Sequence, residues 1–365
     1  RHSYVGPAWY SREIEIPASW KGRNVSLYLE RVMWQSKVWI DGVALEGVQE
    51  SLTTPHRFDL PSDIRTGKHR LTIRIDNRKQ YDISVKDLAH AYTNETQMMW
   101  NGILGEISLC AKEDLSIEGI QIYPDVKNKS VRIKGKLVNR GKSVKGNAEI
   151  RIGERASDVP FFEKEEEIDL VPGETMVDFY CSLGDRVQNW SEFTPVLYDL
   201  SLSVKTEHLE TTEHVAFGMR QIEREGADIL MNGKKVFLRG TLECCVFPLT
   251  GCPPTTEEGW RKVFLTAKEW GLNHLRFHSW CPPEAAFHVA DSMGIYLQVE
   301  CGGWAEVGSG KPQDQWLKEE SDRILEEYGN HPSFCMMVYG NEPGGADQVR
   351  YLSGLIDHWK KKDPR

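Results

Sequence analysis

A glutamate follows an apolar run near residue 340. The run FCMMVY, residues 334–339, leads directly into Gly340, Asn341, Glu342 and Pro343. Such a run is typical of a strand covered on both faces, as in a parallel sheet, although a short buried helix also fits it. In barrels built from such strands, catalytic side chains gather where the strands end. Glu342 therefore holds a position suited to a general acid or base. The structural alternative is a carboxylate stabilised at the N-terminus of the following helix.

Other polar and aromatic side chains follow two more strand-like runs, NHLRFH and IYLQVE. They are Arg276, His278, Trp280, Glu300 and Trp304. Alternation points Arg276 into the interior, where a guanidinium needs a carboxylate partner, and we expect that partner to be Glu342 or a carboxylate outside this chain. The histidine and the two tryptophans either contact a ligand or pack in the core.

The composition excludes several classes of function. The net charge is -9 and the one lysine run, residues 360–362, is short, so nucleic acid is not an expected partner. No stretch approaches the length of a membrane span. The eight cysteines form no CxxC pair and have no histidine at zinc-finger spacing, so we expect free thiols, no metal and no cofactor. The chain opens without an apolar signal region, so any export segment lies upstream or has been removed.

Two all-β parts precede the candidate residues. In residues 1–112, NVSLYLE and RLTIRI alternate apolar and polar side chains, and Asp41-Gly42 supplies a two-residue hairpin turn. This part is predicted to be a sandwich or jelly roll. Residues 113–219 contain about seven short strand-like runs, which fit an immunoglobulin-like β-sandwich on shape alone.

From residue 220 to 365 the pattern changes to alternating strands and helices. Four strand–helix units predict a parallel sheet with right-handed crossovers. Four units are also half of a (β/α)8 barrel, and an open half would leave strand edges unpaired. The sheet is therefore either complete as a small doubly wound domain, or the chain lacks the C-terminal part of a barrel.

Several segments, in this order and spacing, resemble glycoside hydrolase family 2, which includes β-galactosidases, β-glucuronidases and β-mannosidases. They are AWYSREIEIP (8–17), WNGILGEISL (100–109), FGMRQIE (217–223), MNGKKVFLRG (231–240), NHLRFHSWCPPEAAFHVADSMGIYLQVE (273–300) and HPSFCMMVYGNEP (331–343). The resemblance implies a jelly-roll β-sandwich, an immunoglobulin-like β-sandwich and the first half of a (β/α)8 TIM barrel. It also implies a retaining exo-β-glycosidase acting on carbohydrate, with a homo-oligomer as one option and a periplasmic or secreted location favoured.

By this resemblance Glu342 is the acid/base and Asn341 binds the sugar 2-hydroxyl. Retaining cleavage also needs a nucleophilic carboxylate about 5 to 5.5 Å from the acid. In the family this residue ends the seventh barrel strand, which is expected beyond Arg365. The resemblance makes Glu300 a sugar contact or a support for one, while Arg276, His278, Trp280 and Trp304 are candidate substrate-binding residues.

The sequence departs from the family pattern at two places. In RFHSWCPPE the histidine comes one position early, and Thr96 stands where many relatives have an aspartate, with Glu95 as a possible substitute. These departures leave the identity of the sugar open. The alternative function is a carbohydrate-binding protein with a degenerate or incomplete barrel that binds glycan without cleaving it.

Overall fold

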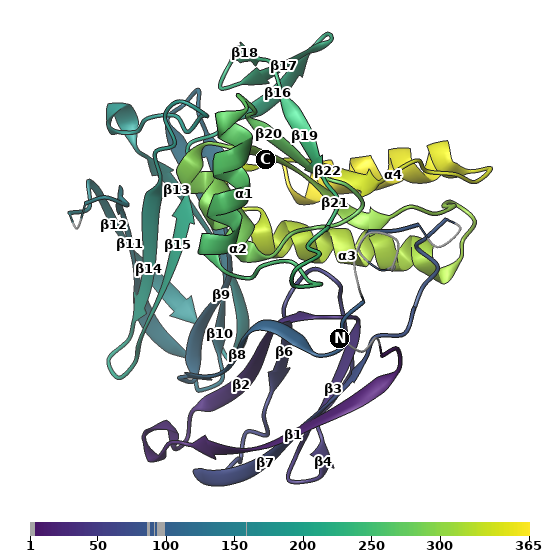
Figure 1. Ribbon diagram of the computed structural model, residues 1–365. Helices are drawn as coiled ribbons and strands as arrows, with labels where there is room; N and C mark the ends of the chain where they lie inside the picture. Colours follow the sequence, from purple (N-terminus) through teal and green to yellow (C-terminus); the bar gives the residue numbers. More distant parts are fainter. Residues whose placement is uncertain (1–3, 86–87, 91, 93–98, 158) are drawn as a thin grey trace.

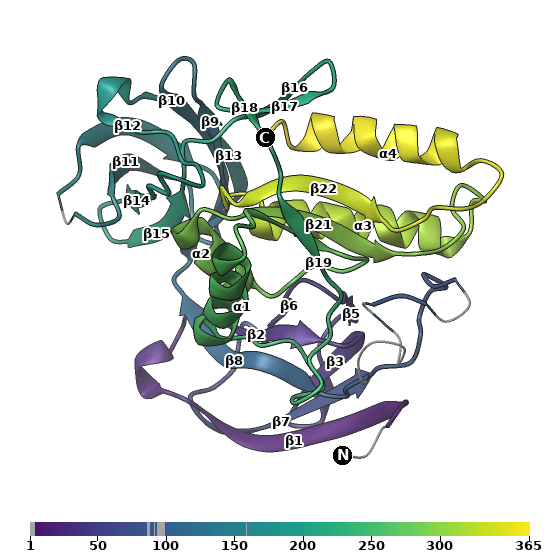
Figure 2. The same cartoon turned by 45° about the horizontal axis from the view of Figure 1, so that its top comes forward.

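The computed structural model describes residues 4–85, 88–90, 92, 99–157 and 159–365, and it has three successive parts (Figure 1). The first two are built from antiparallel sheets and the third from a parallel sheet with helices. Figures 1 and 2 show the first part below the parallel sheet and the second part beside it. No helix among the described residues is long and apolar enough to cross a membrane.

The first part consists of two facing antiparallel sheets. One has the order β1 (Pro7–Ile16), β7 (Gly67–Asp76), β3 (Gln35–Ile40), β4 (Val43–Ala44), with β5 (Gln49–Glu50) also on β3; the other has β6 (His56–Asp59), β2 (Asn24–Val32), β8 (Ile103–Lys112). The alternation predicted for β2 and β7 is confirmed, since Leu27, Leu29 and Ile75 are buried in the core between the sheets. The predicted turn is confirmed too, with positive φ at both Asp41 and Gly42.

The second part contains seven strands among the described residues, in agreement with the sequence. Its sheets have the orders β13 (Gly173–Ser182), β10 (Ser130–Asn139), β9 (Leu115–Asp125), and β12 (Phe162–Leu170), β11 (Val144–Glu154), β14 (Tyr198–Lys205), β15 (Glu210–Phe217). Their inward apolar side chains form a separate core.

The third part opens with the small antiparallel sheet β16 (Ile222–Glu225), β17 (Asp228–Met231), β18 (Lys234–Val236). A parallel sheet follows in chain order: β19 (Gly240–Glu243), β20 (His274–Phe277), β21 (Tyr296–Gly303), β22 (Phe334–Gly340). The helices α1 (Glu257–Glu269), α2 (Glu284–Met293) and α3 (Pro312–Tyr328) alternate with these strands, and α4 (Gln348–Lys362) comes last. The four predicted strand–helix units are therefore confirmed. Within the described residues the sheet is open, with β19 and β22 at its edges.

A buried glutamate on α3 joins the first part to the third. Glu320 has 0% exposure, and its Oε1 accepts hydrogen bonds from Ser51 Oγ at 2.9 Å, from the Leu52 amide at 3.0 Å and from Thr53 Oγ1 at 2.5 Å. Arg323 donates to the other carboxylate oxygen at 2.7 Å. Because every oxygen of this buried carboxylate is bonded, the loop before β6 is held firmly on α3.

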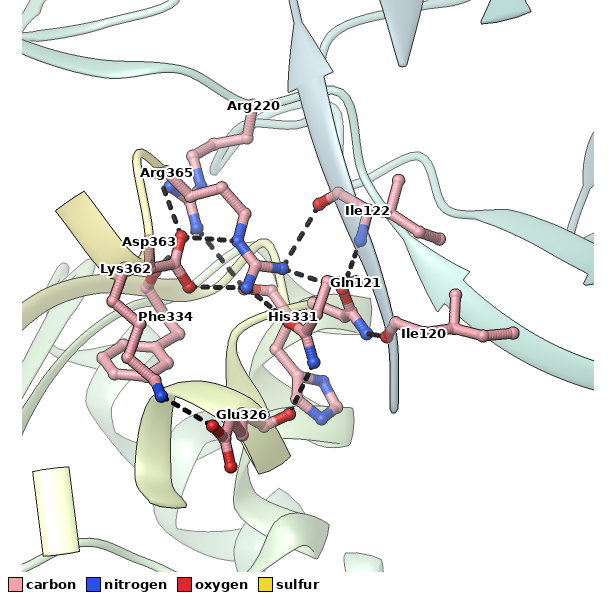
Figure 3. A network of polar contacts seen from close by, with 11 residues as sticks. Ile120, Gln121, Ile122, Arg220, Glu326, His331, Phe334, Lys362, Asp363 and Arg365 are labelled. Carbon is pink, nitrogen blue, oxygen red and sulfur yellow. Dashed lines mark hydrogen bonds and ion pairs between the residues drawn. The ribbon is translucent and has the colours of Figure 1, made fainter. Parts of the chain in front are cut away.

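A second polar network joins the end of α4 to β9 in the second part (Figure 3). Arg365 donates to the Ile122 carbonyl at 3.2 Å and to Gln121 Oε1 at 2.7 Å, and it is paired with Asp363. Nearby, Arg220 donates to the Phe334 carbonyl at 2.7 Å. The parallel sheet is thus fixed to both β parts, which gives the site at its end a rigid frame.

Candidate active site

The predicted site residues lie at one end of the parallel sheet. Neighbouring parallel strands run in the same direction, so their C-terminal ends share an edge. Glu243 ends β19, His278 follows β20, Trp304 follows β21 and Asn341 follows β22. Residues far apart in the chain are therefore brought together here by topology.

Arg276 is the centre of the polar contacts at this end. Its Nε donates to Glu300 Oε1 at 2.6 Å, and its Nη2 donates to Asn341 Oδ1 at 3.0 Å. The other oxygen of Glu300 accepts from the Ser279 amide at 2.5 Å. The prediction that Arg276 pairs with Glu342 or with a carboxylate outside the chain is wrong, because Glu300, on the neighbouring strand, supplies the compensating charge.

Glu300 itself is a positioning residue in this structure. Its side chain has 0% exposure, and both oxygens are bonded to the chain. A carboxylate that attacks a substrate must reach it from an accessible position, so Glu300 is unsuited to that role. Its contacts instead hold Arg276 beside Asn341.

Glu342 is exposed and has an unusual backbone conformation. Its φ is +39°, a region that residues other than glycine rarely adopt. Its Oε2 accepts a hydrogen bond from Trp304 Nε1 at 3.1 Å. Backbone strain of this kind is concentrated at functional sites, where the surroundings maintain it.

The strand end before Glu342 is fixed by close backbone contact. The Asn341 amide donates to the Gly303 carbonyl at 2.9 Å, and a Cβ at Gly340 would lie 1.8 Å from that same oxygen. Only glycine therefore fits at residue 340. The following helix α4 begins at Gln348, so Glu342 lies outside its first turn and the helix-terminus explanation for this carboxylate is not supported.

His278 and Trp304 form an aromatic wall beside Glu342, together with a histidine that the sequence analysis missed. The ring centroids of His278 and Trp304 are 5.0 Å apart, and those of His90 and His278 are 4.8 Å apart. His90 comes from the first part of the chain, where its amide donates to Ser279 Oγ at 3.1 Å. Its one sequence signal was the long connection between β7 and β8, since long loops are often functional.

Trp280 does not belong to this wall. It is 1% exposed, its Nε1 donates to the Glu243 carbonyl at 3.0 Å, and its ring packs against Phe277 and Trp260. The predicted ligand contact is therefore corrected to a core packing role, because both faces of the ring lie within the protein interior.

Glu243 is a further carboxylate that the sequence analysis did not single out. Its Oε2 accepts from the Cys245 amide at 3.0 Å. Burial raises the pKa of this carboxyl to about 7, against the lowering effect of the Cys245 and Val246 amides. Its place at the end of β19, by analogy with Glu300, was the available signal. Glu95 and Thr96 lie outside the described residues.

Comparison with known proteins shows which family this chain is similar to. The model of glycosyl hydrolases family 2 matches residues 115–220. The β-galactosidase large subunit of Latilactobacillus sakei is 24% identical over 97% of this chain and 56% of its own length. A family 2 member from Bacteroides cellulosilyticus superposes with a TM-score of 0.82 at 20% identity, over 99% of this chain and 49% of that one. The chain is therefore similar to glycosyl hydrolase family 2 in sequence and shares the fold of its members.

These similarities confirm the resemblance to family 2 inferred from the sequence. A family 2 β-galacturonidase from Eisenbergiella tayi bound to galacturonate also shares the fold, with a TM-score of 0.81 and 22% identity over 99% of this chain and 63% of that one. The chain spans about half the length of the curated relatives it matches. The family match falls on the second part, whereas the candidate site residues other than His90 follow residue 220.

Proposed function

We propose that the chain carries the acid/base half of the active site of a retaining exo-β-glycosidase that removes terminal β-linked sugars from oligo- or polysaccharides. The observation that carries the proposal is the exposed Glu342 carboxylate, held by Trp304 Nε1 at the end of a parallel strand. A general acid must reach the leaving oxygen, and an exposed, oriented carboxylate meets that requirement.

Asn341 is proposed to bind the sugar 2-hydroxyl. Its Oδ1 accepts from Arg276, so the amide NH2 is left as the donor for a ligand. Hydrogen bonds to the 2-hydroxyl strengthen in the transition state of glycoside cleavage. Arg276 and Glu300 act through Asn341, because they fix which way its amide faces.

The aromatic wall supplies the contact surface for the sugar ring. Trp304 is half-buried, so part of its indole is accessible for stacking, and His278 lies against its edge. His278 donates to a sugar hydroxyl in this proposal. His90 completes the wall from the first part.

The domain architecture is proposed from the resemblance to glycoside hydrolase family 2. Residues 1–112 form a jelly-roll domain, residues 113–219 an immunoglobulin-like domain, and residues 220–365 the first half of a (β/α)8 barrel. The open parallel sheet and the two facing pairs of antiparallel sheets support this division. The nucleophile is proposed to follow Arg365, because Glu300, the acidic residue within the preceding strand β21, is wholly buried.

The sugar is proposed to be a β-galactoside, as in the curated relatives, which are named β-galactosidases. Structural neighbours named β-glucuronidases and a β-galacturonidase make uronides the second choice. The test is turnover of aryl β-galactoside, glucuronide, mannoside and glucoside by the full-length protein, with Glu342→Gln and the exposed Glu306→Gln as a matched pair. We expect Glu342→Gln alone to abolish most turnover.

A protein that binds glycans without cleaving them gives a different result. Sugar binding measured by calorimetry with no turnover of any aryl glycoside would replace the enzyme with the carbohydrate-binding alternative.

A further inference from the structure

Three potential metal ligands from three separate segments meet beside the candidate active site. His90, Cys244 and His278 each offer one ligand atom, and these atoms all lie within 4.8 Å of one another. Cys244 directly follows β19, and His278 directly follows β20. His90 is brought to them by its amide hydrogen bond to Ser279 Oγ.

His278 carries a buried nitrogen that the described chain leaves unbonded. Its side chain is nearly enclosed, with the residue 9% exposed, and Nδ1 is buried without a hydrogen-bond partner among the described residues. Its backbone N–H donates a hydrogen bond to the Glu243 carbonyl at 2.9 Å, which holds the backbone in place. A buried polar atom without a partner is costly, so a native structure normally provides one. This nitrogen is therefore a candidate ligand atom for a bound ion.

We propose that His90, Cys244 and His278 bind one divalent cation of the zinc class. Two imidazoles and a thiolate are a ligand set that zinc prefers, and a fourth position then remains for water or another ligand. In a tetrahedral zinc site the ligand atoms lie roughly 3.3 to 3.7 Å apart, given bond lengths of about 2.0 to 2.3 Å. The three ligand atoms here lie within 4.8 Å of one another, so a bound ion would draw them closer together.

Zinc binds imidazole in its neutral form and cysteine as the thiolate. The charge of a bound ion would itself favour loss of the Cys244 thiol proton.

An ion here would connect the first part of the chain to the ends of two parallel strands. Both histidine rings contact Trp304, with centroids 5.0 and 5.7 Å away. The indole N–H of Trp304 holds Glu342. Metal binding would thus make the aromatic wall beside Glu342 more rigid, although the ion itself would not contact Glu342. The sequence expectation of no metal rested on local spacing. The three residues of this cluster are separated by more than a hundred residues and by one strand–helix unit, so local spacing does not reveal them.

The test measures metal binding and does not depend on catalysis. The full-length protein is stripped with a chelator and titrated with Co²⁺ and with Zn²⁺, with stoichiometry read by calorimetry and elemental analysis. We expect one ion per chain, a sulfur-to-cobalt charge-transfer band in the near ultraviolet, and a rise in melting temperature on adding Zn²⁺.

Matched variants locate the site. Cys244→Ser should lose the charge-transfer band, and His278→Gln should weaken binding by at least about 10- to 100-fold, as loss of supporting contacts alone commonly does. Cys110→Ser, an exposed thiol on β8, should change neither. His288→Ala tests the second cluster, Glu284, His288 and His331, where His331 already pairs with Asp291 at 2.6 Å.

The outcomes separate cleanly. Far-UV circular dichroism and melting curves first establish that each variant is folded, and His278→Gln provides a second measurement should Cys244→Ser be unstable. Absence of stoichiometric binding to the wild-type protein, a band that persists in Cys244→Ser, or loss of binding in His288→Ala would each overturn the proposal.

Discussion

Arg276 donates its Nη2 to Asn341 Oδ1 at 3.0 Å, across the end of the parallel sheet from β20 to the residue after β22. The contact requires the planar fork of arginine, because Nε of the same group donates to Glu300. A buried carboxylate, a guanidinium and an amide are thereby arranged in a row that ends at the residue before Glu342.

Arg276→Lys should lower kcat/KM of the full-length enzyme. A lysine keeps the charge but cannot contact Glu300 and Asn341 together, so the Asn341 amide loses its fixed orientation. Misplacement of this kind costs up to about 10²-fold. Steady-state kinetics on an aryl glycoside measures it, with Arg350→Lys, an exposed arginine on α4, as control. Unchanged kinetics would show that Asn341 is oriented without Arg276.

Glu342→Ala should slow the enzyme by a factor that depends on the leaving group of the substrate. A general acid contributes about 10²- to 10⁴-fold, and only where the departing oxygen needs a proton. Cleavage of an ordinary glycoside should fall severely, whereas formation of the glycosyl-enzyme from a dinitrophenyl glycoside should be affected much less. Pre-steady-state kinetics should then show accumulated intermediate, and azide should restore turnover.

An equal loss on both leaving groups, without azide rescue and with a lower melting temperature, contradicts the acid/base role of Glu342. It would mark the side chain as a support for the strained backbone at residue 342.

Glu243 should make stability depend on pH. Its pKa is raised to about 7 in the folded protein from its ordinary value of 4.5, so the folded state binds the proton more tightly than the unfolded state. Stability from this group is therefore fully present below about pH 4.5 and is lost as the pH rises to about 7, by at most about 3 kcal/mol. Urea unfolding at several pH values should show a flatter profile for Glu243→Gln than for wild type. Parallel profiles for the two proteins would argue against the shifted pKa.

Glu320→Ala should destabilise the protein by about 3 to 5 kcal/mol, because it leaves Arg323 and three buried donors without their acceptor. Urea unfolding of the variant checks this value. Glu319→Ala on the exposed side of α3 should change stability by at most about 0.5 kcal/mol. A small effect at Glu320 would mean that water replaces the carboxylate.

Periodicity predicted the elements but not the partners of the polar side chains. Alternation in β2 and the apolar run of β22 are local patterns, and burial of their side chains follows directly from them. The partner of Arg276 is a different matter. Glu300 lies within β21 and Glu342 just after the neighbouring β22, and the sequence does not say which carboxylate the guanidinium reaches. The chain bends after Gly340 and turns Glu342 outward, and this bend decides that Arg276 contacts Glu300 and not Glu342.

His90 and Trp280 show the other limit of sequence reasoning. The segment around His90 has no periodic pattern, and its place depends on how the first part packs on the parallel sheet through Glu320 and Ser51. Trp280 lies only two residues beyond His278, but its ring turns back among Phe277 and Trp260. Side-chain direction after a strand depends on tertiary packing, which no local spacing encodes.

The bond between Glu320 and the segment 51–53 has a consequence for how the chain folds during synthesis. The two sides of this contact are 267 to 269 residues apart in sequence. At about 5 to 20 residues per second, the ribosome completes the first part of the chain well before α3 emerges. Until then Ser51 and Thr53 face solvent next to the apolar residues Trp34 and Leu52, whose packing partners in the third part have not been made. During this interval the first part of the nascent chain exposes an apolar surface. We expect chaperone binding to be concentrated in the same interval.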